Sequence, residues 1–188
     1  QGAAAEYKAL EPALARASAI ERPRAIRCSA LGARLEARAT DAVTLANSAV
    51  KSLEGQQVSM SERASLQAEL GLALLEAGDV TAADFALRTS RAEFSEGQVR
   101  PSPDVLDVEV GLARVALSHG RKTEALALLD EALKYWRDAD PAGLDAAAVD
   151  YWHAGARGSP PAAATMATLR ASPYPLHRKW IATAAAAR

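Results

Sequence analysis

Two stretches of the chain carry the same pattern of large and small residues at identical offsets. The first pattern consists of Leu70, Gly71, Leu74, Gly78, Ala83, Leu87 and Ser90. The second consists of Leu112, Ala113, Ala116, Gly120, Ala125, Leu129 and Ala132. A looser copy precedes both and consists of Ala30, Ala33, Ala37, Ala42, Ala46 and Ala49. The copies lie about 41 residues apart, and a repeat of this length predicts units that stack to bury their apolar faces.

Each copy is expected to be a pair of helices. Alanine, the best helix former, supplies roughly a quarter of the residues, whereas aromatic residues make up only 5%. Because strands favour aromatic and β-branched residues, all-β folds are excluded. The expected helices span residues 2–19, 23–39, 42–53, 60–77, 81–94, 104–118, 123–138, 144–156, 161–171 and 175–187.

Small residues within the pattern have two expected roles. Gly78 and Gly120 allow the positive φ that ends a helix in a tight turn. Ala83 and Ala125 hold equivalent positions in the second helix of each pair, where two helices must approach closely. Outside this pattern, the spacing of Ser59 and Glu62 is typical of a capping box and predicts the start of a helix.

These residues resemble the tetratricopeptide repeat (TPR) over about residues 22–140. The best matches are Leu70, Gly71, Leu74, Gly78, Ala83, Leu87 and Ser90. The resemblance implies an all-α fold, a right-handed superhelix of stacked antiparallel hairpins. The period exceeds the family's usual 34 residues, which implies longer helices. The family's aromatic positions are filled here by Leu or Ala, so a generic array of helical hairpins is the alternative.

The expected organisation is a single TPR-like domain over residues 1–188. Its repeat units are residues 22–55, 59–97 and 103–140, and degenerate helices over 142–188 serve as a cap. Residues 151–188 carry five Arg or Lys side chains and no acidic one. A polar cap is favoured for this segment over a contact with phosphate or nucleic acid, because the positive charges are sparse.

Charge and motifs exclude several functions. The net charge is -1, which argues against a nucleic-acid or membrane-surface protein. The sequence contains no nucleophile elbow, no phosphate-binding glycine loop and no zinc-protease motif. His119, His153 and His177 are isolated in the sequence, and the single Cys28 cannot form an intramolecular disulfide. The chain is therefore not expected to be an enzyme or to hold a metal or cofactor.

Two further expectations concern packing. Cys28 has apolar neighbours and is expected to be buried as a small hydrophobic residue. Trp136 ends one expected helix, while Tyr151 and Trp152 lie in the next. Antiparallel packing is expected to bring Trp136 against one of the later pair in an aromatic core cluster.

The resemblance also places a binding surface. If Ala30, Gly71 and Ala113 are equivalent, the inward face of the first helices forms an apolar groove with Arg residues near its edges. The candidate partner-binding residues are Arg27, Leu31, Arg34, Leu72, Leu75, Val110, Arg114 and Leu117. Since Arg pairs with carboxylates in a fork while its stem covers apolar surface, an apolar peptide with acidic flanks is the expected ligand.

The expected function is a protein-interaction scaffold that binds a peptide or partner protein in this groove, without nucleic acid or membrane insertion. Its chain begins with Gln1 and has an Arg-rich, Ala-rich composition, which suggests a module of a larger bacterial signalling or regulatory protein. A self-association module forming a homo-oligomer and a domain that senses a small molecule are the alternatives. The cytoplasm is the favoured compartment, with the periplasm as the alternative if an anchor or signal precedes Gln1.

The alanine pattern generates a first prediction. Replacing Ala83 or Ala125 with Leu should overpack a helix contact and lower the free energy of unfolding by about 1–3 kcal/mol. Thermal denaturation measures the effect. Unchanged stability of both variants would contradict the assignment of these residues to helix contacts.

Overall fold

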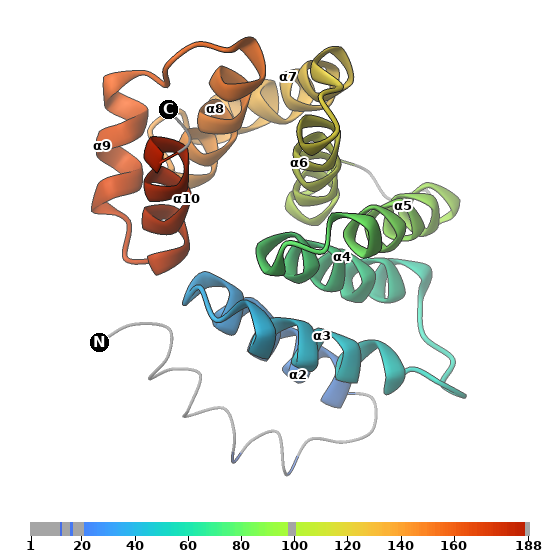
Figure 1. Ribbon diagram of the computed structural model, residues 1–188. Coiled ribbons are helices and arrows are strands. Elements are labelled where there is room, and N and C mark those ends of the chain that lie inside the picture. Colours follow the sequence, from blue (N-terminus) through green and yellow to red (C-terminus); the bar gives the residue numbers. More distant parts are fainter. Residues whose placement is uncertain (1–11, 13–15, 17–20, 98–100, 187–188) are drawn as a thin grey trace. The chain divides into compact units, whose positions relative to one another are not determined.

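The computed structural model describes residues 12, 16, 21–97 and 101–186. Within this part of the chain, every regular element is a helix (Figure 1). The helices are Arg22–Leu35 (α2), Ala39–Lys51 (α3), Met60–Ala77 (α4), Val80–Glu96 (α5), Pro103–Ser118 (α6), Lys122–Ala139 (α7), Leu144–Arg157 (α8), Ala163–Ala171 (α9) and Pro175–Ala186 (α10). The helix expected over residues 2–19 lies almost entirely outside the described residues.

Several of these helices begin and end at the signals present in the sequence. Ser59 Oγ accepts a hydrogen bond of 3.1 Å from the Glu62 N–H at the start of α4. The Glu62 carboxylate binds Arg24 instead of completing the expected capping box. Gly78 and Gly120 have φ values of +88° and +73°, as expected, and both follow a first helix of a predicted repeat.

The helices form two compact units, and the boundary between them lies inside α6. Gln1–Val108 contains α2 to α5 and the first turns of α6, whereas Glu109–Arg188 contains the rest of α6 and α7 to α10. The helix pairs α2–α3 and α4–α5 fall within the predicted repeats 22–55 and 59–97. That the whole chain forms one domain stays a prediction.

Alanine contacts hold the first unit together. Ala33, Ala42 and Ala73 join α2, α3 and α4 in one cluster, and each is fully buried. In Figure 1 the colour runs from blue at α2 and α3 to green at α4. Ala83 on α5 is also fully buried, as is Ala125 on α7 in the second unit, so the expected burial of both alanines is confirmed.

Two helices of the first unit approach each other closely at Gly71. A Cβ atom added to this glycine would lie 2.6 Å from Leu87 Cγ and 3.2 Å from the Leu87 backbone nitrogen. Because real Cβ atoms do not come so near other heavy atoms, α4 and α5 meet at a distance that only glycine permits. The Leu–Gly pair of the pattern therefore follows from helix packing and not from a turn.

The exposure of Cys28 contradicts the expectation that this residue is buried. Its side chain is exposed and its thiol is free. On α2 the buried residues include Ser29, Ala30 and Ala33, which leaves Cys28 on the solvent side of the helix. Apolar neighbours in the sequence did not predict burial here, because successive helical residues point in different directions.

Glycine substitutions test the close approach at Gly71. Gly71→Ala should lower the free energy of unfolding by about 1–3 kcal/mol, because α4 and α5 must separate or Leu87 must leave its position. The matched control is Gly155→Ala on α8, where an added Cβ meets nothing within 4 Å. That change should raise stability by up to about 1 kcal/mol, since alanine favours the helix.

Urea denaturation of both variants provides the comparison. Equal effects of the two substitutions would show that α4 and α5 do not meet as described.

Candidate functional site

The predicted binding residues are divided between the two units. Leu31, Leu72 and Leu75 lie on α2 and α4 of the first unit, where Leu72 is buried and the other two are half-buried. Val110 and Leu117 lie half-buried on the part of α6 that belongs to the second unit. In the first unit α2 and α4 contact each other, so these first helices lie side by side.

An ion pair between Arg34 and Glu69 joins α2 to α4. Arg34 Nε lies 2.8 Å from Glu69 Oε1 and Nη2 lies 3.2 Å from Oε2, so the guanidinium binds the carboxylate in a fork. The two side chains are only 10% and 4% exposed. Such planar, bidentate pairing suits arginine in particular. The predicted groove cation is therefore a buried structural residue.

The charges around Arg34 explain how it stays ionised inside the protein. Burial lowers the pKa of its guanidinium, but the carboxylates of Glu69, Asp107 and Glu76 together outweigh burial, and the pKa is raised overall. Glu69, which also accepts hydrogen bonds from Arg34, has the largest effect of the three. One buried arginine thus faces several carboxylates, and it compensates their charges.

A second polar contact ties α2 and α4 to the start of α6. Arg27 Nη2 donates to Asp104 Oδ1 at 2.8 Å, and Ser65 Oγ donates to Asp104 Oδ2 at 2.6 Å. Asp104 therefore receives one donor from each of the two preceding first helices. The Arg27 side chain is 32% exposed, so part of it faces solvent beside this contact.

The sequence did not assign partners to these arginines. Glu69 lies between the buried positions Leu66 and Leu70, and a charge in such a stripe requires a partner. Arg34 follows the buried Ala30 and Ala33 in the same way. Charged residues within two apolar stripes were therefore the signal for this pair, although the sequence does not show which charge meets which.

Arg114, in the second unit, is stacked on aromatic rings. Its guanidinium carbon lies 4.6 Å from the centre of the Trp152 ring and 5.1 Å from that of Trp180. The rings of Tyr151 and Trp180 are stacked, with their centres 6.5 Å apart. The Tyr151 hydroxyl donates a hydrogen bond of 2.9 Å to the Trp180 backbone oxygen. Trp180 on α10 was not expected in this cluster, whereas Trp136 forms an edge-on pair with Tyr135.

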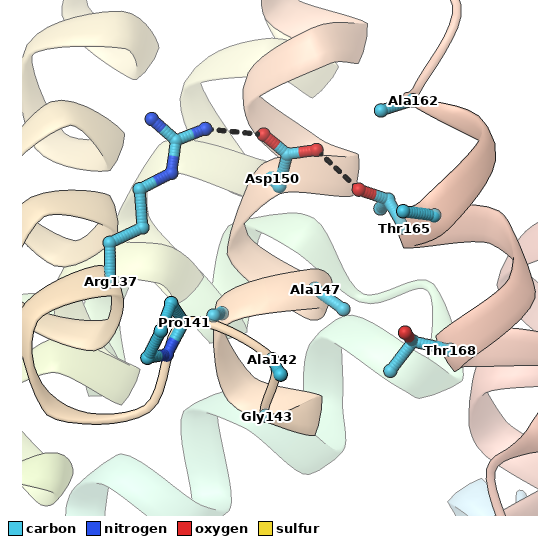
Figure 2. Close-up of a pocket in the computed structure, with 11 residues that line it drawn as sticks. Arg137, Pro141, Ala142, Gly143, Ala147, Asp150, Ala162, Thr165 and Thr168 are labelled. Atoms are coloured by element: carbon cyan, nitrogen blue, oxygen red, sulfur yellow. Dashed lines mark hydrogen bonds and ion pairs between the residues drawn. The ribbon is translucent and has the colours of Figure 1, made fainter.

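A cavity of about 400 Å³ opens in the second unit between α7, α8 and α9 (Figure 2). Most of its wall consists of Ala, Gly and Pro residues. Because these residues are small, the space between the helices is left unfilled. The lining residues are Arg137, Pro141, Ala142, Gly143, Ala146, Ala147, Asp150, Ala162, Ala164, Thr165 and Thr168.

Asp150 connects the three helices at one side of the cavity. Its Oδ1 accepts a hydrogen bond of 3.0 Å from Arg137 Nη2, and its Oδ2 accepts one of 2.6 Å from Thr165 Oγ1. Figure 2 shows Arg137 and Thr165 reaching Asp150 from opposite directions. The cavity thus combines a small apolar wall with one positive and one negative side chain.

Other features bear on metal binding and on membrane insertion. Across the described part of the chain, no group of three His, Cys, Asp or Glu side chains could hold a metal ion. None of the helices described is both long and apolar enough to span a bilayer. His153 Nε2 lies 2.9 Å from Asp130 Oδ1, and His177 Nδ1 lies 2.8 Å from Ser172 Oγ, so each of these histidines has a local polar partner.

Comparison with known proteins identifies the fold. No family model matches the chain, and no curated protein matches its sequence. A solved structure is similar: a variant of a kinesin light chain-like protein from Podosopora anserina with nearly identical TPR-like repeats. The TM-score is 0.61 at 21% identity, over 83% of this chain and 77% of that one. The chain is therefore an all-α TPR-like helical repeat protein, as its sequence pattern predicted.

The buried ion pair generates a stability prediction. Arg34→Met should lower the free energy of unfolding by about 3–5 kcal/mol, because Glu69 would be buried without its cation. Glu69→Met should cost less, since Asp107 and Glu76 still face Arg34. The double variant should cost less than the sum of the single ones.

Chemical denaturation of the three variants measures this coupling. The control is Arg88→Met, which removes an exposed pair with Asp84 on α5 and should cost less than about 1 kcal/mol. Additive effects at Arg34 and Glu69 would mean that the two side chains do not interact.

Proposed function

We propose that this chain is a protein-interaction scaffold that binds a partner protein or peptide on the face of its first helices. The side-by-side packing of α2 and α4 carries the proposal. Stacked helical repeats offer extended surfaces made from equivalent helices, and such surfaces suit peptides and helices. The ion pair of Arg34 with Glu69 supports a rigid face in the first unit, because it fixes two of these helices before a partner arrives.

The partner of this proposal is an apolar peptide with acidic flanks. Leu31 and Leu75 are half-buried and supply apolar contact area on α2 and α4. Arg27 uses one N–H for Asp104, and the exposed part of its guanidinium can still bind a carboxylate. Arg34 is buried, where it pairs with Glu69 and joins α2 to α4, and it does not contact the partner in this proposal. Val110, Arg114 and Leu117 lie on α6 of the second unit, and their part in binding stays a separate prediction.

The wider setting belongs to the same proposal. The chain is a module of a larger bacterial signalling or regulatory protein, acts without catalysis, and binds neither nucleic acid nor membrane. The alternative is a self-association module that buries an apolar helix face between copies. Light scattering over a range of concentrations distinguishes the two, because self-association raises the mean mass as concentration increases.

Selection of binding peptides tests the proposed face. Peptides selected from a displayed library should carry apolar residues with Asp or Glu on at least one side. Arg27→Gln should weaken their binding by about five- to tenfold, because a charged hydrogen bond at the edge of the face is lost. Arg88→Gln on α5 is the matched control, since it removes an exposed arginine from a second helix.

Two results would contradict the proposal. Binding that tolerates Arg27→Gln and a polar substitution at Leu75 would place the partner on another surface. Equal losses from Arg27→Gln and Arg88→Gln would indicate a general charge effect. Circular dichroism of each variant establishes that the helices are intact.

A further inference from the structure

The cavity between α7, α8 and α9 belongs to the second unit, whereas the proposed partner-binding face of α2 and α4 belongs to the first. Its volume of about 400 Å³ lies in the range of small-molecule pockets. Most of its lining is apolar and small, so a short aliphatic group can fill it without displacing a large side chain. The polar side chains Arg137, Asp150, Thr165 and Thr168 complete the lining.

The two charged residues offer a donor and an acceptor beside each other. Arg137 donates to Asp150 through Nη2, which leaves its other guanidinium N–H groups for a ligand. Asp150 accepts from Arg137 and Thr165, and each carboxylate oxygen can accept more than one hydrogen bond. A carboxylate can therefore bind at Arg137 while an ammonium group binds at Asp150.

The contact between the two charged residues disfavours a ligand with a single charge. Asp150 opposes a simple anion at Arg137, and Arg137 opposes a simple cation at Asp150, because their side chains lie 3.0 Å apart. A ligand with both charges satisfies the pair without adding net charge to the site.

We propose that this cavity binds a small zwitterion, chemically an α-amino acid with an aliphatic side chain. Its carboxylate binds the Arg137 guanidinium, its ammonium group binds Asp150, and its side chain lies against Ala142, Ala147 and Ala164. This role goes beyond peptide binding, because it makes the second unit a receptor for a small molecule.

Three probes with the same aliphatic body separate the contributions of the charges. L-Leucine carries both charges, 4-methylpentanoate carries only the carboxylate, and 3-methylbutylamine carries only the ammonium group. Titrations of the whole chain followed by NMR should show leucine binding at least about tenfold more tightly than either probe with one charge. The shifted signals should include Thr165 and Thr168.

Charge variants identify the recognition groups. Arg137→Gln should reduce leucine binding about tenfold or more, to the level of 3-methylbutylamine. Asp150→Asn keeps an acceptor for Thr165 and should reduce leucine binding to the level of 4-methylpentanoate. Arg157→Gln, at an exposed arginine of α8 that does not line the cavity, is the control and should leave binding unchanged.

A matched pair of alanine substitutions identifies the location. Ala164→Leu places a side chain in the cavity and should abolish leucine binding, whereas Ala163→Leu, one residue away and outside the lining, should preserve it. Both positions are exposed on α9, so the fold should tolerate either change.

Several results would overturn the proposal. Absence of leucine binding, equal or tighter binding of a probe with one charge, or equal effects of Ala163→Leu and Ala164→Leu would each exclude an amino-acid site in this cavity. These outcomes leave the peptide-binding proposal standing, since that proposal depends on α2 and α4.

Discussion

Close approach between helices is the constraint on which the first unit depends. Gly71 leaves room for Leu87, and the alanines at 33, 42 and 73 bring α2, α3 and α4 into contact. Short side chains give each contact little apolar area, so many close contacts must replace a few large ones. The repeated Ala and Gly residues therefore determine how closely the helices pack, and larger residues at those positions would separate the helices.

Charged residues add a second kind of contact between the helices that the small residues bring together. Arg34 and Glu69 fill a buried position between α2 and α4, and Asp104 receives donors from Arg27 and Ser65. Desolvation offsets much of the attraction within a buried pair, whereas removing one partner leaves the other charge uncompensated. The pair therefore favours the alignment of α2 and α4 in which both charges are matched.

The second unit uses different chemistry. Arg114 lies over Trp152 and Trp180, and Tyr151 is hydrogen-bonded to the backbone of α10. Aromatic and cation–π contacts thus hold α10 in place, in a part of the chain that lies beyond the predicted repeat units. Between α7, α8 and α9 the small residues are not matched by larger ones, and the cavity remains.

The sequence predicted the helical repeat and the turns because these depend on local signals. Ala83, Gly78 and Gly120 reveal their roles through spacing and residue type alone. The partners of Arg34 and Arg114 could not be predicted, since they come from helices whose relative rotation the repeat pattern does not fix. The cavity was also missed, because an unfilled space depends on how several helices pack and leaves no motif in the chain.

Methyl contacts test the central claim, that alanines hold the first helices and their partners together at close range. In an NMR experiment with labelled alanine methyl groups, the account predicts nuclear Overhauser effects that link Ala33, Ala42 and Ala73 to one another. A well-folded spectrum in which the Ala33 methyl group contacts neither of the other two would contradict the packing of α2 against α3 and α4.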